Sequence, residues 1–303
     1  MEKHYEIRLY DVYENSDIVL GENDKFLGHY WPDMNTKEQG NNSWSRFDED
    51  HVTNKVMVRY PNDPRVFGIS PFNHSIEQNG WAIPLLRQLH CYIGINGDYW
   101  MESLAQSPYA FMKGRMFHLN MPIDQESYPR IKRSFGKKGA RKFFYIGRVS
   151  KEKNTAMLEQ IAASSPHFEG GYIGNGLIKG WKQIAAKAAL TPDYMMKLSQ
   201  EYDVFINTST FDAQATTVLE AMSWGFAVAC TPESGYTDAP IFQLSATDLE
   251  HNLKMIDAIQ ATEESELHER VRQYDHLLAE KYTWKKFADK LIKILNNELV
   301  QTN

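Results

Sequence analysis

The sequence predicts an α/β protein with two domains, each built around a parallel sheet. Its 303 residues exceed the length of one ordinary domain and suit two. In the second half, short apolar runs alternate with segments of helical spacing, which is typical of a parallel sheet with both faces covered. A basic segment, residues 130–142, joins this half to a first half with less regular patterning. We place the domain boundary within this segment, near Lys137.

The second half has the clearer pattern of elements. Its apolar runs predict strands at residues 142–147, 168–174, 203–207 and 226–230. Helical spacing predicts helices at residues 154–163 and 177–189, and a third helix that carries Glu220. A capping box at residues 247–250 predicts the start of a further helix. Amphipathic helices are expected at residues 266–280 and 284–295.

The first half has shorter apolar runs. They predict strands at residues 17–20, 55–58, 66–69, 91–94 and 116–119. A polar, Asn-rich section at residues 33–50 is expected to form a loop or lid. The predicted domains are therefore residues 1–137 and 138–283, followed by a C-terminal helical segment at 284–303.

The composition argues against several classes of protein. A formal net charge of -6 disfavours a general nucleic-acid-binding protein, because such domains are usually basic. No apolar run approaches the roughly 20 residues that cross a bilayer, and the first residues lack the pattern of a secretory signal. Cys91 and Cys230 each lie in an apolar context, which favours reduced core thiols over a disulfide. We therefore expect a cytoplasmic protein.

The most informative stretch is the predicted strand at 203–207 with the turn and helix that follow it. Asp212 lies on the turn, and the helix opens with small residues. A helix N-terminus carries unpaired backbone N–H groups and the positive end of the helix dipole, so it suits a diphosphate. We expect Glu220 in the first helical turn, where its carboxylate could accept hydrogen bonds from a sugar hydroxyl. This arrangement favours a nucleotide-sugar site.

A second stretch supplies cations at another strand-to-helix junction. Arg148 offers a planar fork of donors and Lys153 a point charge further along. Ligands of open parallel sheets bind at the carboxyl ends of strands, so the two cations could neutralise a diphosphate there. Two solvated surface cations are the alternative. The agreement with the turn at Asp212 favours the phosphate site.

These motifs together resemble the C-terminal domain of retaining GT-B glycosyltransferases, above all glycosyltransferase family 4. The resemblance covers residues 140–298 and extends weakly to 119–124, which is similar to the family's interdomain segment. It implies a GT-B fold, in which two Rossmann-like domains face a cleft and the final helix, 284–303, crosses back to the first domain. Here the N-terminal domain is reduced.

The resemblance also implies roles for individual residues. Arg148 and Lys153 would bind the donor diphosphate, Glu220 the ribose, and Asp212 the transferred sugar. The family often places a histidine near the reacting sugar, which here is His74; a turn histidine that caps the next helix is the alternative. The remaining residues expected around the donor are Gly147, Gly174, Asn175, Gln214, Ala215, Thr216 and Thr217.

The sequence departs from the family pattern at several points. Asp212 stands where the family normally has Glu, and Ala213 and Ala215 stand where it has glycines. Alanine resists positive φ, so this loop must approach the phosphates differently. The glycine-rich loop after the first strand has no counterpart, which leaves open that an oligomer or a separate chain completes the domain.

Two further patterns are weaker. Gly174-Asn175-Gly176, with Gly180 beyond, partly imitates a dinucleotide fingerprint but is not on the first strand of its domain, so we expect a tight turn near the donor and no NAD. Residues 48–50 match an Asp-x-Asp metal motif but lie in a polar loop, and no His/Cys cluster has metal-ligand spacing. We therefore expect no metal site.

The expected function is that of a metal-independent retaining glycosyltransferase that needs no cofactor. It would move a sugar from a nucleotide-diphosphate sugar to an acceptor hydroxyl, in the synthesis of a surface glycan such as lipopolysaccharide, capsule or O-antigen. Open alternatives are a non-catalytic or partner-dependent sugar-nucleotide-binding subunit, an enzyme that modifies viral DNA or protein, and a nicotinamide-dependent oxidoreductase. The basic residues of 130–142 could contact anionic lipid at the inner face of a membrane, or form a solvated linker.

Overall fold

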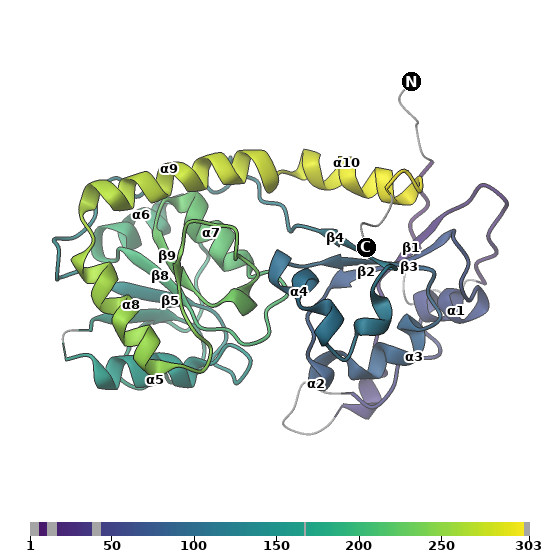
Figure 1. The fold of residues 1–303 in the computed structure, drawn as a ribbon, viewed down its shortest axis with the longest axis horizontal. Helices are drawn as coiled ribbons and strands as arrows, with labels where there is room; N and C mark the ends of the chain where they lie inside the picture. The colour runs from purple at the N-terminus through teal and green to yellow at the C-terminus, as the bar shows by residue number, and fades with distance from the viewer. Residues whose placement is uncertain (1–5, 11–16, 38–43, 167, 300–303) are drawn as a thin grey trace.

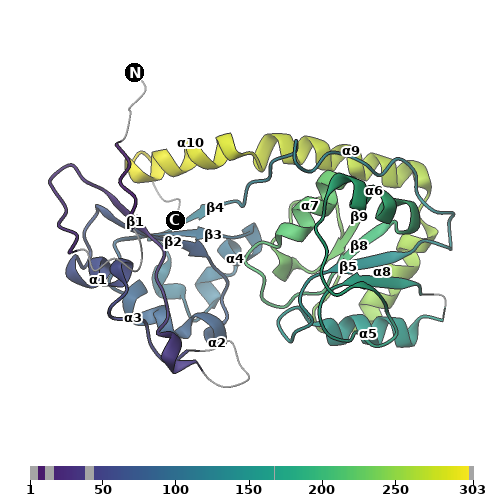
Figure 2. The ribbon, with the colours of Figure 1, turned by 180° about the vertical axis from the view of Figure 1, so that it is seen from behind.

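The computed structural model describes residues 6–10, 17–37, 44–166 and 168–299. They form two α/β domains that lie side by side, and the last two helices run along both domains (Figures 1 and 2). The first domain has a four-stranded sheet in the order β1-β2-β3-β4, and the second a six-stranded sheet in the order β10-β9-β8-β5-β6-β7. All strand pairs in both sheets are parallel. The predicted α/β architecture is therefore confirmed.

The elements of the first domain are short. Its strands are β1 Phe26–Gly28, β2 Val66–Pro71, β3 Cys91–Ile95 and β4 Met116–Leu119. Its α-helices are α1 Val52–Arg59, α2 Ile76–Asn79, α3 Ile83–Leu86 and α4 Asp98–Glu102. Four 3-10 turns connect them: η1 Met34–Thr36, η2 Gly80–Ala82, η3 Leu104–Gln106 and η4 Ala110–Met112.

The second domain alternates strands with longer helices. Its strands are β5 Phe143–Ile146, β6 Gly170–Ile173, β7 Lys182–Ala185, β8 Val204–Asn207, β9 Ala227–Cys230 and β10 Phe242–Gln243. The helices are α5 Thr155–Ser164, α6 Pro192–Glu201, α7 Thr216–Trp224, α8 Leu249–Ala261, α9 Glu264–Lys281 and α10 Trp284–Leu295, with one 3-10 turn, η5 Pro232–Ser234.

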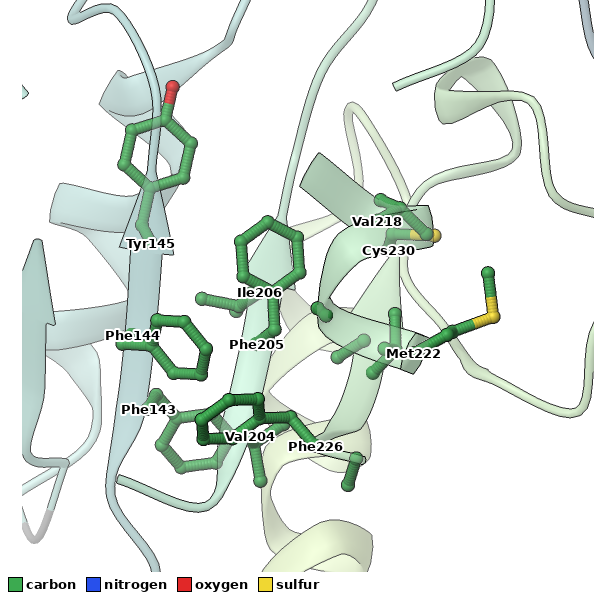
Figure 3. Packing of buried hydrophobic residues seen from close by; sticks show 14 of the residues in the cluster. Phe143, Phe144, Tyr145, Val204, Phe205, Ile206, Val218, Met222, Phe226 and Cys230 are labelled. Atoms are coloured by element: carbon green, nitrogen blue, oxygen red, sulfur yellow. The ribbon is translucent and has the colours of Figure 1, made fainter. Parts of the chain in front are cut away.

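The core of the second domain forms around the central strands β5, β8 and β9. Figure 3 shows aromatic and branched side chains of β5 and β8 packed beside Val218 and Met222 of α7. The rings of Phe144 and Phe226 lie 4.6 Å apart between centroids. These strands are continuous apolar runs because helices cover both faces of a parallel sheet. Cys230 is free and buried in this core, as is Cys91 in the first domain, which confirms the prediction of core thiols.

The final helix crosses back to the first domain, as the resemblance implied. Ile294 of α10 is fully buried against Phe67, Ile93 and Leu119 of the first sheet. Thr283 caps this helix, and its hydroxyl accepts a hydrogen bond from the Lys286 N–H at 3.2 Å. Both ribbon views show α10 beside β4 (Figures 1 and 2).

Three predicted elements of secondary structure are wrong. Residues 55–58 lie in helix α1, because Val52, Val56 and Met57 form one buried helical face rather than an alternating strand. Residues 17–20 form no strand, and the first strand is β1. Residues 177–189 form no helix and contain the edge strand β7, while helix α6 follows them. A smaller correction concerns α8, whose cap is Asp248, with its carboxylate accepting from the His251 N–H at 2.9 Å.

The basic segment 130–142 packs on the second domain. The core of that domain includes Ile123, Ile131 and Phe135, whereas Leu119 packs in the first domain. The chain therefore passes from one core to the other near Asn120 rather than near Lys137. The Lys132 ammonium is 2.8 Å from the Asp203 carboxylate, and both side chains are almost fully buried.

Other cations of this segment have partners in the same domain. Arg130 binds Asp275 at 2.7 Å, and the buried Arg141 guanidinium donates to the carbonyls of Ile259 and Thr262. These side chains are therefore engaged within the second domain and do not form a solvated linker, while contact of this segment with lipid stays a prediction. No helix in the described ranges has the length and apolar character required to cross a membrane.

Candidate functional site

The candidate site lies where the carboxyl ends of β5, β6 and β8 meet the first domain. Gly147 follows β5 and Gly174 follows β6. A Cβ atom on Gly174 would lie 2.2 Å from the Gly147 carbonyl oxygen, so only glycine permits this approach of the two backbones. The Tyr145 hydroxyl donates to the Arg148 carbonyl at 2.7 Å and fixes the loop after β5. Asn175 lies exposed beside this junction.

The two predicted cations differ in their surroundings. The Arg148 side chain is 69% exposed and lies 3.1 Å from the Glu152 carboxylate. The Lys153 ammonium is largely covered and forms an ion pair with the Asp212 carboxylate. Asn154, which follows Lys153, adopts a left-handed conformation with φ 51° as the chain turns into α5. The structure thus brings Lys153 to Asp212 and leaves Arg148 open to solvent.

The turn before α7 leaves backbone donors at the helix N-terminus. The N–H of Asp212 donates to the Glu233 carbonyl at 3.1 Å, and that of Ala215 to the Ser234 carbonyl at 3.0 Å. Ala215 caps the helix with φ -65°, so the alanines form this loop without positive φ. The first N–H groups of an α-helix have no intrahelical acceptor. Those of Thr216 and Thr217 are therefore the donors that an anion would meet here.

Glu220 lies deeper in α7 than the sequence suggested. It is the fifth residue of the helix, in the second turn rather than the first. Its side chain is half-buried and, within the described part of the chain, has no hydrogen bond or ion pair. Burial raises the pKa of this carboxyl above its ordinary value of 4.5. A half-buried carboxylate without a partner is costly, and a ligand hydroxyl would satisfy it.

Asp212 lies on a turn that the first domain contacts directly. Donors of the first domain bind three consecutive backbone carbonyls of this turn. The Phe211 carbonyl accepts from the Asn73 side chain at 3.2 Å, and the Asp212 carbonyl from the Trp100 indole N–H at 2.8 Å. The Ala213 carbonyl accepts from the Gly97 N–H at 2.9 Å. None of these first-domain residues was predicted. One sequence signal could have pointed to them, because Asn73, Gly97 and Trp100 each follow the end of a strand in a parallel sheet, where ligand sites commonly lie.

His74 lies beside these contacts, after the end of β2. Its ring packs edge-on against Trp100 at 5.1 Å between centroids, and its Nδ1 lies 3.4 Å from the Ser103 hydroxyl. Its Nε2 is buried without a hydrogen bond among the described residues. Burial lowers the pKa of His74 to about 4, so the imidazole is neutral at physiological pH.

Gln214 and Glu233 complete the junction between the domains. The Gln214 side chain is buried and bonds the Met121 N–H at 2.5 Å and the Asn120 amide at 3.2 Å, so it points to the interdomain segment rather than to open space. The Glu233 carboxylate accepts from the Tyr99 hydroxyl at 3.4 Å, and burial raises its pKa. Glu233 is a further candidate that the sequence patterns missed.

The described residues contain no group of three or more His, Cys, Asp or Glu side chains that could hold a metal ion. The Asp-x-Asp match at residues 48–50 lies in a bend before α1, where Glu49 and Asp50 are exposed.

Comparison with protein-family models and with curated proteins finds no match. Comparison with solved structures finds many, at low sequence identity. TarM is 12% identical with a TM-score of 0.57, and the match covers 76% of this chain and 50% of TarM. Sucrose-phosphate synthase from Thermosynechococcus elongatus is 10% identical with a TM-score of 0.60, covering 77% of this chain and 67% of the synthase.

HepE from Anabaena, in complex with UDP and glucose, is 13% identical with a TM-score of 0.58, and the match covers 80% of this chain and 76% of HepE. The chain thus spans half the length of TarM and a larger share of the others. At such identities the likeness shows the fold alone. Two parallel α/β domains, the crossing of α10 and these neighbours together show that the chain has the GT-B fold.

Proposed function

We propose that this chain is a glycosyltransferase that uses a nucleotide-diphosphate sugar as donor. The observation that carries the proposal is the unpaired carboxylate of Glu220 on α7, the helix that follows the turn where Asp212 pairs with Lys153. A nucleotide sugar needs both partners, an anion site for its diphosphate and an acceptor for its ribose hydroxyls. The neighbouring GT-B structures of HepE contain UDP with glucose or UDP-glucose, which supports the same class of donor.

The donor would lie along the carboxyl ends of β5 and β8. Arg148 and Lys153 supply charge to the diphosphate, and the N–H groups of Thr216 and Thr217 supply directed hydrogen bonds. Glu220 accepts from the ribose. Gly147 and Gly174, which have no side chains, would let the donor approach the backbone, beside Asn175.

Catalysis in this proposal depends on stabilising the departing diphosphate. Preorganised cations and helix dipoles commonly supply most of the rate enhancement in such reactions. We propose the retaining stereochemistry and the absence of a metal that the resemblance to family 4 implies, with front-face attack by the acceptor hydroxyl and transfer of its proton to the departing phosphate. Asp212, held by Lys153, would position the transferred sugar, and His74 would act as a neutral hydrogen-bonding group.

The acceptor would bind from the side of the first domain, where residues that follow β2 and β3 contact the turn that carries Asp212. We propose a hydroxyl of a surface glycan precursor, handled in the cytoplasm. A protein or a viral DNA base are the alternatives that an acceptor screen would separate. The overall charge of -6 favours a glycan over DNA.

The test begins with thermal-shift measurements against UDP-, GDP- and ADP-sugars, because a ligand that binds the folded state raises its melting temperature. With the donor known, Arg148→Ala and Lys153→Ala are expected to lower turnover at least about tenfold. Lys254→Ala, an exposed lysine paired with Glu250 on α8, is the matched control and should leave turnover unchanged. Equal turnover in all three variants would refute the assignment.

A second candidate is a nucleotide-sugar-binding subunit that needs a partner for catalysis. The small four-stranded first sheet favours it, together with the fact that the chain spans half of TarM. Sugar-nucleotide binding by the purified chain, without donor hydrolysis or transfer to any acceptor in a broad panel, would identify this function. Turnover by the chain alone would exclude it.

A further inference from the structure

A second cavity lies away from the candidate donor site, between α10 and the end of β4. Its volume is about 410 Å³, and its walls include Leu119 and Asn120, where the chain leaves the first sheet. Figure 1 shows α10 above β4 at this place. Small-molecule sites commonly occupy about 300–1,000 Å³, so the cavity can hold a phosphate group with a small organic portion.

Three lysines of α10 line this cavity on one side. Lys286, Lys290 and Lys293 are spaced four and three residues apart, so they share one flank of the helix. In the ranges that the structure describes, none of their ammonium groups has a hydrogen bond or ion pair. Like charges at this spacing repel one another, so the row is destabilising unless an anion joins it.

Lys290 is the lysine least exposed to water. Its side chain is half-buried, and burial lowers the pKa of its ammonium, against which the charge of Asp98 acts in the opposite direction. Asp98 is already engaged, because its carboxylate binds the Lys281 ammonium at 2.6 Å. A covered ammonium without its own acceptor is costly, whereas solvated lysines of a helix surface are not.

The carboxylates at the cavity wall offset this row only in part. The hydrogen bond from Lys285, as well as the charges of Lys293 and Lys286, lowers the pKa of Asp289. Glu280 lies 3.3 Å from His276, and Asp289 lies 2.7 Å from Lys285, so each is directed to a partner on its own helix. The remaining cation at the wall, Lys281, is shared between Asp98 and Asp238. The cavity therefore keeps a positive charge that its own acidic residues leave uncompensated.

We propose that the cavity between α10 and the end of β4 is a binding site for a phosphate-bearing anion, held by Lys286, Lys290 and Lys293. Ammonium groups are general phosphate binders, and three of them around one cavity provide the charge for a doubly charged group. The anion could be a free phosphate compound or the phosphate of an anionic lipid, since both present the same oxygens. This site is independent of the proposed sugar transfer.

The experiment compares full-length wild-type protein with Lys290→Gln and with the control Lys285→Gln. Lys285 is on the same helix but does not line the cavity, and it loses the same charge. Calorimetric titration with inorganic phosphate should give equal affinity for wild type and control. Lys290→Gln should bind about tenfold more weakly, the loss expected for one charge-assisted hydrogen bond. A Lys286→Gln, Lys293→Gln double variant gives the same test with exposed residues, should Lys290→Gln fold poorly.

Sedimentation with phosphatidylglycerol vesicles, against phosphatidylcholine vesicles, identifies the source of the phosphate. Binding to the anionic vesicles by wild type and control but not by Lys290→Gln supports the site with a lipid as ligand. Equal behaviour of Lys290→Gln and control with both probes, or no binding of either probe by wild type, overturns the proposal. Lys153→Ala changes only the candidate donor site and should leave the Lys290-dependent binding intact, so the two proposals can fail separately.

Discussion

Glu220→Gln should stabilise the free protein and weaken its binding of a nucleotide. In the free protein the Glu220 carboxylate is half-buried and lacks a partner among the described residues. Leaving a buried polar group unsatisfied costs about 1–3 kcal/mol, more for a charged group, and half burial places the cost near the lower end. Removing the charge should therefore raise the free energy of unfolding by about 1 kcal/mol, or the melting temperature by about 2–4 °C.

The pH dependence of stability tests independently whether the Glu220 carboxylate destabilises the folded protein. Burial raises the pKa of Glu220 above 4.5 in the folded state, so the folded protein holds this proton more tightly than the unfolded chain does. The carboxyl therefore destabilises the fold progressively as the pH rises through the folded pKa. Below about pH 4 the group is protonated in both states, and the advantage of Glu220→Gln should vanish.

Chemical denaturation at pH 4 and pH 7 measures the stability, and calorimetry at pH 7 measures the nucleotide affinity. The affinity should fall roughly tenfold, because a charged acceptor forms about twice as strong a hydrogen bond as a neutral amide. Glu250→Gln, exposed and paired with Lys254 at 2.8 Å, is the control and should change stability by less than about 0.5 kcal/mol. A Glu220→Gln protein that is less stable at pH 7, or equally stabilised at both pH values, would refute the reasoning.

Three further changes test the packing. Gly97→Ala would place a Cβ 1.9 Å from the Gly235 carbonyl oxygen, so it should lower the free energy of unfolding by at least about 1–3 kcal/mol and separate the domains. X-ray scattering should then give a larger radius of gyration, and an unchanged radius would contradict the close contact. Lys132→Met leaves Asp203 buried without its cation and should cost about 3–5 kcal/mol in urea unfolding, whereas a neutral result would mean that the pair is solvated. Ile294→Ala should cost about 2–5 kcal/mol and speed proteolysis after residue 283, and a loss below about 1 kcal/mol would mean that α10 is not packed on the first sheet.

The second domain could be predicted from the sequence because its elements have distinct periods. Apolar runs that end at glycines predicted the bounds of β5 and β6 to within two residues of those observed. The bounds of α10 agree with the prediction. The failure at residues 177–189 has a physical reason. Gly176 and Gly180 adopt positive φ, which interrupts any helix, and β7 is an edge strand with exposed Lys182 and Gln183, so it has no apolar pattern.

The geometry of the candidate site could be predicted only where its residues are close in sequence. Residues 147–153 and 212–220 each lie in one strand–turn–helix unit, so their approach follows from the parallel sheet. Asn73, Gly97 and Trp100 come from the other domain, and no local pattern tells which backbone groups they will meet. Asn73 lies in a loop and Trp100 in helix α4, and the role of each depends on how the two domains dock.

Hydrogen bonds from the first domain link the shape of the turn at Asp212 to the docking of the two domains. The carbonyls of Phe211, Asp212 and Ala213 accept from the first domain, while the Asp212 N–H donates to the Glu233 carbonyl in the second. Held from both sides, the turn does not need the freedom of glycine, which explains how alanine suffices at position 213. Each hydrogen bond contributes about 1 kcal/mol net, so three of them favour the closed arrangement by roughly 100-fold over one in which the domains separate. Separation of the domains would therefore also remove these contacts from the turn whose Asp212 pairs with Lys153.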